Sequence, residues 1–353
     1  MRVTWIALEW PRAGHHSGGV GRYVQRLAER TKDLVELTVI CFEGAVPMDG
    51  VAFETLPAPR GRLDRYYASA FRASRAVRRL APDVVHSHGD DILLPSGVPL
   101  VRTFYGSSLN EARSSRGLRK LNHYVLALLE QRSASRATLK LGIAPESLEM
   151  MACDAIFPPY FGVEPAPRDI SATPTVVFIG SFEGRKQGHI AQSAVAAIRE
   201  EQGDVDLIVI GPQSDASSWE PWVDHRSGLS DDEVATLVRS AWVLVSPSAY
   251  EGFGIPVLEG LDHGLSVVAH PNPGSEYLKS LASGPVPLDL ATGEVFTTAL
   301  RQRIETGPVL DAAEQQAARQ LIDEIVEAGS PARLVAMYDD ARARAAPATR
   351  RLG

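Results

Sequence analysis

The sequence predicts an α/β protein made of two parallel-sheet domains. Short apolar runs alternate with amphipathic stretches along most of the chain, as in strands joined by crossover helices. A proline-rich segment near residue 160 interrupts this alternation once, and the pattern then starts again. The chain has 353 residues, enough for about two domains. With 44% hydrophobic and 22% charged residues, the composition excludes a mainly disordered chain.

The first half has four apolar runs that we interpret as strands. They lie at residues 3–8, 37–42, 83–88 and 99–104. Helical periodicity occupies the stretches near 20–31, 64–80 and 118–136. Residues 158–174 contain five prolines, a composition typical of a linker. We therefore place a first domain at residues 1–160.

The same alternation returns after the linker and predicts a second domain at residues 161–330. Its strands are expected at 175–181, 206–211, 242–247 and 265–271. Its helices are expected near 187–201, 231–241, 256–263 and 275–282, and residues 292–346 are mostly helical. Two open sheets joined by a linker predict a cleft between the domains, with ligands at the carboxyl ends of the strands.

Charge is unevenly distributed along the chain, whose formal net charge is −7. Residues 1–160 carry 21 Lys and Arg against 16 Asp and Glu, whereas residues 161–353 carry 15 against 27. The excess bases form two groups: Arg60, Arg62, Arg65, Arg72, Arg75, Arg78 and Arg79, and then Arg113, Arg116, Arg119 and Lys120. They form either solvated helix faces or a surface for an anionic partner, such as a phosphorylated acceptor or a membrane. The acidic total and the lack of a recognised motif argue against nucleic acid.

Cysteine usage and the N-terminal residues predict a compartment. A single disulfide, all that Cys41 and Cys153 could form, would not hold together a fold of this length, and no Cys/His cluster suggests zinc. A reducing compartment suits such usage. The first apolar run is short and lacks a signal-peptide cleavage site, and no stretch reaches 18 apolar residues. We expect a cytoplasmic protein, either free or bound peripherally at the inner membrane face.

The most informative segment is SPSAYEGFGIPVLEG at residues 246–260. A buried strand runs into a glycine-containing loop, and Pro256 suits the first turn of a helix. Glycines let the backbone turn tightly, and amides at a helix N-terminus bind anions. Glu251 and Glu259, eight positions apart, flank this anion site. One acid suits the hydroxyls of a sugar and the other a ribose diol, with a diphosphate between them. An ordinary capped surface helix is the alternative.

Two further segments have the same strand–loop–helix arrangement. In VVFIGSFEGRKQGHI (176–190), a strand ends at Gly180 and the bases Arg185 and Lys186 precede a helix. Such cations suit a leaving diphosphate, although a charged helix start is the alternative. In HHSGGVGRYVQRLAER (15–30), glycines 18, 19 and 21 separate a strand from a helix, which by itself indicates no more than a tight turn.

Together these segments resemble the retaining glycosyltransferases of family 4, which have the GT-B fold. The resemblance rests above all on the E-x7-E pattern of Glu251 and Glu259, and it extends over nearly the whole chain. It implies two Rossmann-like α/β domains facing across a cleft. It also implies that the last helix, within about 331–353, crosses back to complete the first domain.

The resemblance assigns roles in binding the donor. Glu251 is expected to contact the donor sugar, and Glu259 the nucleotide ribose. Arg185 and Lys186 are expected to neutralise the diphosphate, although Ser181 stands where the family usually has Arg. The remaining donor-binding candidates are loop positions: Gly18, Gly19, Gly180, Gly252, Phe253, Gly254 and Ile255.

The resemblance also indicates a contact with the sugar or the acceptor on the first domain. Many relatives carry His where this chain has Tyr105, which can hydrogen-bond a sugar hydroxyl but cannot act as a base at neutral pH. His88 and Arg22 are further candidates. His86 and His88 are two residues apart on a strand, so they face the same side, and structural packing is the alternative for both.

The expected activity is retaining transfer of a sugar from a UDP-, GDP-, ADP- or dTDP-sugar to an acceptor hydroxyl. We expect a front-face mechanism with no metal and no cofactor. The acceptor is expected to be a small molecule, such as a natural product, or a cell-envelope glycan or lipid. The alternatives are a nucleotide-sugar epimerase or phosphorylase of the same architecture, and a nucleotide-sugar-binding partner protein without catalysis.

Overall fold

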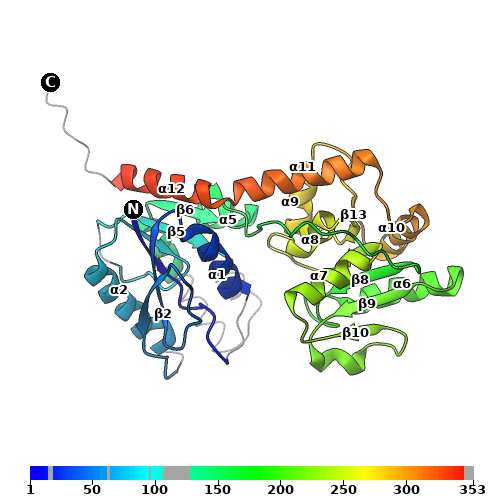
Figure 1. The fold of residues 1–353 in the computed structure, drawn as a ribbon, viewed down its shortest axis with the longest axis horizontal. Helices are drawn as coiled ribbons and strands as arrows, with labels where there is room; N and C mark the ends of the chain where they lie inside the picture. Colours follow the sequence, from blue (N-terminus) through cyan, green and yellow to red (C-terminus); the bar gives the residue numbers. More distant parts are fainter. Residues whose placement is uncertain (15–18, 62–63, 95–96, 106–127, 346–353) are drawn as a thin grey trace. The chain divides into compact units, whose positions relative to one another are not determined.

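The computed structural model describes residues 1–14, 19–61, 64–94, 97–105 and 128–345 (Figure 1). The chain divides into two compact units. Unit 1 comprises Met1–Pro159 together with Ala328–Gly353, and unit 2 comprises Tyr160–Glu327. Each unit is built on a parallel sheet covered by helices, so the predicted α/β class with two Rossmann-like domains is confirmed.

Among the described residues, unit 1 has a seven-stranded parallel sheet in the order β3-β2-β1-β4-β5-β6-β7. Its strands are β1 (Arg2–Ile6), β2 (Glu36–Phe42), β3 (Ala52–Leu56), β4 (Val84–Ser87), β5 (Leu100–Phe104), β6 (Leu139–Gly142) and β7 (Ala155–Ile156). The chain runs outward from β1 to β3 and then returns to β4 on the other side of β1. The strand order therefore reverses between β1 and β4, where open α/β sheets bind ligands.

The helices of unit 1 include the final helix of the chain. They are α1 (Gly19–Thr31), α2 (Ser69–Leu80) after the π-helical turn η1 (Asp64–Ala68), α5 (Pro145–Met151) and α12 (Pro331–Ala345). The indole of Trp5 on β1 donates to the Tyr338 hydroxyl of α12 over 3.0 Å, and both side chains are fully buried. The predicted return of the last helix to the first domain is therefore confirmed. Of the helix predicted at 118–136, residues 128–136 are helical and the rest lie outside the described residues.

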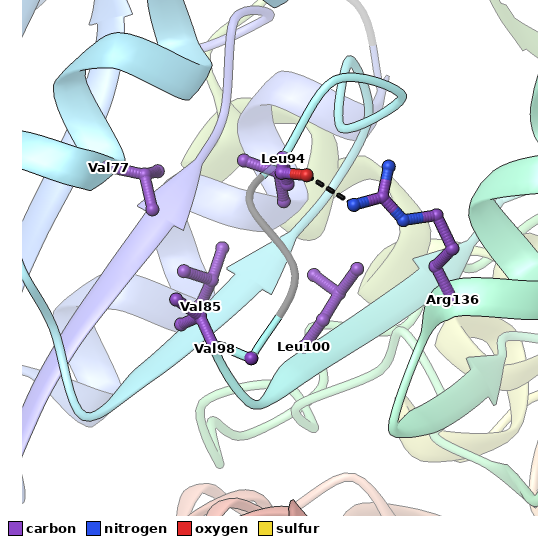
Figure 2. Close-up of a pocket in the computed structure, with 7 residues that line it drawn as sticks. Val77, Val85, Leu94, Val98, Leu100 and Arg136 are labelled. Carbon is purple, nitrogen blue, oxygen red and sulfur yellow. Dashed lines mark hydrogen bonds between the residues drawn. The ribbon is translucent and has the colours of Figure 1, made fainter.

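A cavity of about 190 Å³ opens in unit 1 between α2 and the strands β4 and β5 (Figure 2). Its walls are aliphatic side chains and one arginine: Val77, Val85, Leu94, Val98, Leu100 and Arg136, together with Gly97. The Arg136 guanidinium donates to the Leu94 carbonyl oxygen.

Among the described residues, unit 2 has a six-stranded parallel sheet in the order β10-β9-β8-β11-β12-β13. Its strands are β8 (Thr175–Ile179), β9 (Asp206–Ile210), β10 (Asp224–Arg226), β11 (Val243–Ser246), β12 (Ser266–Ala269) and β13 (Leu288–Leu290). The strand order reverses between β8 and β11. The apolar runs that predicted β8, β11 and β12 are buried because helices cover both faces of such a sheet.

Helices and one 3₁₀ turn complete unit 2. They are α6 (Gly188–Gln202), η2 (Gln213–Ser218), α7 (Asp231–Ser240), α8 (Ile255–Asp262), α9 (Pro273–Leu281), α10 (Gly293–Thr306) and α11 (Ala312–Ala328). Helix α7 begins with a capping box: the Ser230 side chain accepts from the Glu233 amide, and the Glu233 carboxylate accepts from the Ser230 amide.

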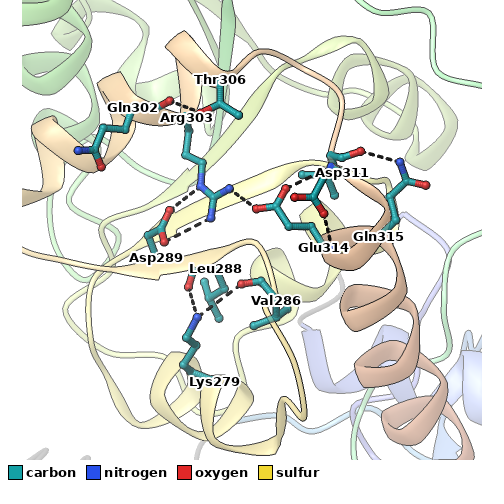
Figure 3. A network of polar contacts seen from close by, with 11 residues as sticks. Lys279, Val286, Leu288, Asp289, Gln302, Arg303, Thr306, Asp311, Glu314 and Gln315 are labelled. Carbon is teal, nitrogen blue, oxygen red and sulfur yellow. Dashed lines mark hydrogen bonds and ion pairs between the residues drawn. The ribbon is translucent and has the colours of Figure 1, made fainter.

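A half-buried arginine on α10 forms ion pairs with β13 and α11 of unit 2 (Figure 3). Arg303 of α10 lies 2.6 Å from the Asp289 carboxylate on β13 and 2.5 Å from the Glu314 carboxylate on α11. Beside it, Lys279 of α9 donates to the Leu288 carbonyl over 2.8 Å. Burial on its own would lower the pKa of Arg303, but the two carboxylates raise it, so this cation stays charged and paired.

Candidate active site

The candidate site of unit 2 lies where the strand order reverses. The loop that carries Arg185 and Lys186 follows β8, and the loop that carries Glu251 follows the adjacent β11. The carboxyl ends of both strands lie at the same edge of the sheet, since their pairing is parallel. The Ala249 amide donates to the Arg185 carbonyl over 2.9 Å, which joins the two loops directly.

Close backbone packing fixes the loop after β8. A Cβ at Gly180 would lie 2.8 Å from the Lys186 Cβ, closer than real side chains approach. A Cβ at Gly211, after β9, would lie 2.5 Å from the Gly180 carbonyl oxygen. Only glycine fits at these two positions, and their close approach sets the direction in which the Lys186 side chain leaves the loop.

Arg185, Lys186 and Glu251 form one ion cluster. We call it the switch cluster because it lies where the strand order of unit 2 reverses, between β8 and β11. Lys186 Nζ lies 2.6 Å from Oε1 of Glu251, and Arg185 Nη1 lies 2.9 Å from Oε2. The Lys186 and Glu251 side chains are 20% and 11% exposed, whereas the Arg185 side chain is 49% exposed. Two cations share one carboxylate, so the cluster keeps one positive charge that an anion can use.

Glu251 stays ionised although it is buried. Burial on its own would raise the pKa of this carboxyl, but the charge and hydrogen bond of Lys186, the charge of Arg185 and a hydrogen bond from Ser248 outweigh it. The pKa of Glu251 therefore lies below its ordinary value. A fixed carboxylate that accepts two cationic donors also preorganises those donors.

The loop between Glu251 and α8 presents its backbone to the same edge. Gly254 precedes the helix with φ +84°, and no side chain caps the first amides of α8. Phe253 is buried, whereas Ile255 is 36% exposed. Pro256 has no N–H, and the Val257 and Leu258 amides donate to the Gly254 carbonyl, so within this first turn only the Ile255 amide is left to bind an anion. The tight turn requires glycine only at 254, because Gly252 has no positive φ and a Cβ there would meet no atom within 4 Å. The tight turn expected of the two glycines is thus found at Gly254, and the expected close approach of Gly252 to a ligand stays a prediction.

Glu259 lies one turn into α8, the helix to which the first residues of unit 2 are hydrogen-bonded. Glu259 is half-buried. Burial, then the Asp262 carboxylate and last the charge of Glu259 raise the pKa of Tyr160. The Tyr160 hydroxyl donates to Asp262 over 2.7 Å, and the Val163 amide donates to the same carboxylate over 2.8 Å. These bonds tie the segment after residue 159 to the helix that carries Glu259.

The sequence did not point to three residues that shape this site. A Cβ at Gly274, in the first turn of α9, would lie 2.8 Å from the Phe253 carbonyl carbon and 2.9 Å from the Glu251 carbonyl oxygen. Asn272 caps α9 and donates to the Ser248 carbonyl over 3.1 Å. Ser248 in turn hydrogen-bonds Glu251. The Asn-Pro-Gly-Ser order at 272–275 is a helix-start signal that could have indicated this third loop.

Of the candidates on unit 1, Gly18 lies outside the described residues. Gly19 begins α1 at an exposed position, and Arg22 is exposed on the next turn. The other two follow neighbouring strands, His88 after β4 and Tyr105 after β5. His88 Nδ1 lies 2.5 Å from the Tyr105 hydroxyl. His86, for which structural packing was considered together with His88, is fully buried and bonded at both ring nitrogens.

Three arginines of the first group form ion pairs within unit 1. Arg65, Arg72 and Arg79 pair with Asp90, Asp64 and Glu54. Arg75 and Arg78 are exposed on α2 with no ion pair among the described residues, and Phe71 is 55% exposed on the same helix face. The second group, at residues 113–120, lies outside the described residues.

Two absences hold for the described part of the chain. No group of three or more His, Cys, Asp or Glu there is placed to hold a metal ion. No helix there is long and apolar enough to cross a membrane.

Two family models match the chain, one in each half. The model described as "Glycosyltransferase Family 4" matches residues 17–145, and the model described as "Glycosyl transferases group 1" matches residues 173–302. The second match includes the whole switch cluster.

Two curated relatives are similar in sequence. An MMP α-(1→4)-mannosyltransferase of Mycolicibacterium hassiacum is 29% identical over 185 residues, which are 48% of this chain and 41% of that protein. The chain thus spans less than half of that relative. A D-inositol 3-phosphate glycosyltransferase of Pseudarthrobacter chlorophenolicus is 25% identical over 324 residues, 74% of this chain and 76% of that protein.

Solved structures share the fold at low sequence identity. WaaG, a glycosyltransferase involved in lipopolysaccharide biosynthesis, has a TM-score of 0.69 at 16% identity, over 95% of this chain and 99% of that chain. A sucrose-phosphate synthase from Thermosynechococcus elongatus has a TM-score of 0.72 at 15% identity, over 97% and 99%. Anabaena HepE in complex with UDP and glucose has a TM-score of 0.67 at 15% identity, over 96% and 99%.

The matches in both halves agree with the two Rossmann-like sheets and with the E-x7-E segment. The fold is therefore GT-B, and both matching family models describe glycosyltransferases. The chain belongs to glycosyltransferase family 4, the glycosyl transferases group 1.

Proposed function

We propose that this enzyme transfers a sugar from a nucleotide-sugar donor to an acceptor hydroxyl with retention of configuration. The switch cluster is the observation that carries the proposal. Its two cations face one carboxylate at the carboxyl edge of β8 and β11, and one positive charge remains for an anion. A diphosphate linked to a sugar offers both an anion for the cations and hydroxyls for the carboxylate.

The donor roles follow from the position of each group. Lys186 and Arg185 bind the diphosphate, together with backbone amides of the loop at residues 252–255 that leads into α8. Glu251 accepts hydrogen bonds from hydroxyls of the sugar, and Glu259 binds the ribose diol. HepE was solved with UDP and glucose, and a curated relative is a mannosyltransferase, so UDP- and GDP-hexoses are the first donors to test.

The proposed chemistry uses the leaving group as the base. The bond between the anomeric carbon and the phosphate oxygen breaks, and the acceptor oxygen bonds to that carbon from the same face. The departing phosphate oxygen takes the proton of the acceptor hydroxyl. Lys186 and Arg185 stabilise the negative charge that grows on the diphosphate, the work that a metal ion does in other transferases. Neither a metal nor a cofactor is required in this scheme.

The acceptor is a hydroxyl of a small molecule or of a cell-envelope glycan or lipid. One relative acts on D-inositol 3-phosphate by its name, and WaaG takes part in lipopolysaccharide biosynthesis. The face of α2 formed by Phe71, Arg75 and Arg78 combines an exposed ring with two exposed cations that have no ion pair within the described part of the chain. We propose peripheral contact of this face with an anionic membrane surface, where a lipid-linked acceptor would lie.

A thermal-shift panel of UDP-, GDP-, ADP- and dTDP-sugars tests the donor assignment. A ligand that binds only the folded protein raises its melting temperature, by an amount that grows with the ratio of ligand concentration to Kd. The donor should stabilise the wild type, and Lys186→Met should lose most of that shift. A wild type indifferent to every activated sugar contradicts the proposal.

A nucleotide-sugar-binding protein without catalysis is the second candidate. Ser181 and Tyr105 depart from the residues that many family members carry, which favours this reading. It predicts donor binding in calorimetry with neither transfer nor hydrolysis of the donor. An epimerase of the same architecture would instead convert the donor with no acceptor present.

A further inference from the structure

The pair formed by His88 and Tyr105 has no role in the chemistry proposed for the switch cluster. The two residues follow adjacent parallel strands, because β4 ends at Ser87 and β5 at Phe104. His88 Nδ1 lies 2.5 Å from the Tyr105 hydroxyl, and the ring planes are inclined by 32°. This is a short hydrogen bond that directs the tyrosine hydroxyl.

His86, two residues earlier on the same strand, shows what a purely structural histidine looks like here. The Trp5 indole donates to the Tyr338 hydroxyl, and that hydroxyl shares a hydrogen bond with His86 Nδ1, 2.7 Å away. Nε2 of His86 shares a second hydrogen bond with the Thr103 hydroxyl over 2.8 Å. Burial lowers the pKa of His86 to about 3, so the ring is neutral and fully used within the fold.

His88 differs because the fold uses only one of its nitrogens. Its Nε2 is buried and has no hydrogen-bond partner among the described residues. The ring packs against Trp5 and His86, with centroids 5.0 Å and 4.2 Å away. A buried polar atom without a partner destabilises a fold, and an aliphatic side chain would avoid that cost. The bond that Nδ1 makes to Tyr105 is therefore what requires an imidazole at this position.

We propose that His88 is a positioning residue that holds the Tyr105 hydroxyl in place to hydrogen-bond a hydroxyl group of the transferred sugar or of the acceptor. The inference rests on the proposed transferase function. His88 follows β4, at the reversal of strand order in unit 1, and Tyr105 follows the neighbouring strand β5. Polar groups that follow strands at such a reversal lie where open α/β sheets bind ligands.

The chemistry of the pair favours a neutral hydroxyl as its ligand. A tyrosine hydroxyl has one donor and two acceptor sites, and His88 occupies one of these. A sugar hydroxyl both donates and accepts, so it fits whichever site remains. Burial lowers the pKa of His88 well below its ordinary value and raises the pKa of Tyr105 well above its own. The pair is therefore uncharged at neutral pH and orients a ligand without acting as a base.

Three substitutions separate positioning from packing. Tyr105→Phe removes the hydroxyl and keeps the ring. His88→Asn keeps an amide near the place of Nδ1, whereas His88→Gln moves that amide toward the place of Nε2. Tyr105→Phe and His88→Gln should each lower kcat/KM by about 10-fold, while His88→Asn should stay within about 3-fold of wild type. Because the two residues act as a unit, the Tyr105→Phe/His88→Gln double variant should be no worse than Tyr105→Phe alone.

Tyr338→Phe is the matched control, since it removes a tyrosine hydroxyl from the structural histidine of the same strand. It should lower the melting temperature and leave kcat/KM unchanged well below that temperature. The assays use the nucleotide sugar that gives the largest thermal shift, with and without acceptor. A contact with the sugar lowers both hydrolysis and transfer in Tyr105→Phe, whereas a contact with the acceptor lowers transfer alone and raises the KM for the acceptor.

Each result bears on the inference. Wild-type rates for Tyr105→Phe in both assays, or equal losses in His88→Asn and His88→Gln, overturn the role of His88 while leaving the transferase function intact. A wild type that neither transfers nor hydrolyses any activated sugar overturns the proposed function, and the role of His88 with it.

Discussion

Replacing each cation of the switch cluster by methionine should have unequal effects on stability. Lys186→Met leaves the buried Glu251 carboxylate with Arg185 as its cationic partner, and Arg185 is half exposed to water. Breaking a fully buried pair costs about 3–5 kcal/mol. Since Arg185 and Ser248 remain, we expect a loss of about 2 kcal/mol for Lys186→Met. Arg185→Met removes an exposed partner and should cost less than about 1 kcal/mol.

The difference should also depend on pH. The pKa of Glu251 is lowered in the folded protein, so its ionised form stabilises the fold above the ordinary carboxyl pKa of about 4.3. That stabilisation is lost as pH falls through the lowered native pKa. In Lys186→Met, burial remains while the strongest attraction is gone, so the pKa of Glu251 should rise. The stability gap to wild type should therefore be largest near neutral pH and shrink toward about pH 4.

Thermal unfolding at several pH values measures this directly. For a unit of this size, about 2 kcal/mol corresponds to a drop of roughly 4–8 °C in melting temperature at pH 7. Arg185→Met should stay within roughly 4 °C of wild type. Equal shifts in the two variants, or a gap that does not change between pH 7 and pH 4, would refute the assignment of Lys186 as the main partner of Glu251.

Three further predictions concern other parts of the chain. Gly274→Ala should displace the loop that holds the carboxylate and weaken donor binding by at least about 10-fold in calorimetry, whereas Gly252→Ala, used as a control for folding only, should leave the melting temperature unchanged. Arg303→Met should lower the free energy of unfolding by about 2–4 kcal/mol in urea titrations, with donor affinity unaltered; a variant as stable as wild type would show that the network in Figure 3 contributes little. Arg75→Glu/Arg78→Glu should abolish co-sedimentation with vesicles rich in anionic lipid, and unchanged sedimentation would exclude that face of α2.

The sequence identified those strands that are buried on both faces. Continuous apolar runs predicted β8, β11 and β12 to within a few residues, because helices cover a parallel sheet on each side. The edge strands β3, β7, β10 and β13 were missed. Residues such as Asp224–Arg226 have no apolar run, and only pairing with a neighbouring strand makes them extended. β6 was missed as well, since it is short and includes Lys140.

The candidate site was accessible to sequence reasoning as separate loops, but its internal pairing was not. Glycines, a proline and charged residues after predicted strands indicated where Arg185, Lys186 and Glu251 belong. Their direct ion pairs depend on parallel pairing of β8 with β11, which joins residues 65 positions apart. The packing of Gly274 against the Glu251 loop depends in the same way on β12 lying beside β11.

The bond between His88 and Tyr105 illustrates the same limit. The sequence showed a tyrosine where many relatives carry histidine, which weakened the role expected for that position. The structure places His88, from the next strand, within hydrogen-bond distance of that tyrosine. A departure that looked like a loss in the sequence is thus part of a pair in three dimensions.

The central claim is that Lys186 and Glu251 hold the diphosphate and sugar of an activated donor, and calorimetric titration tests it most directly. Wild type and Lys186→Met are each titrated with the nucleoside diphosphate and with the bare nucleoside of the donor that the panel identifies. Losing a charge-assisted hydrogen bond of about 1.5–3 kcal/mol should weaken diphosphate binding by roughly 10- to 150-fold and leave nucleoside binding unchanged. Equal affinities of the two proteins for the diphosphate would contradict the account.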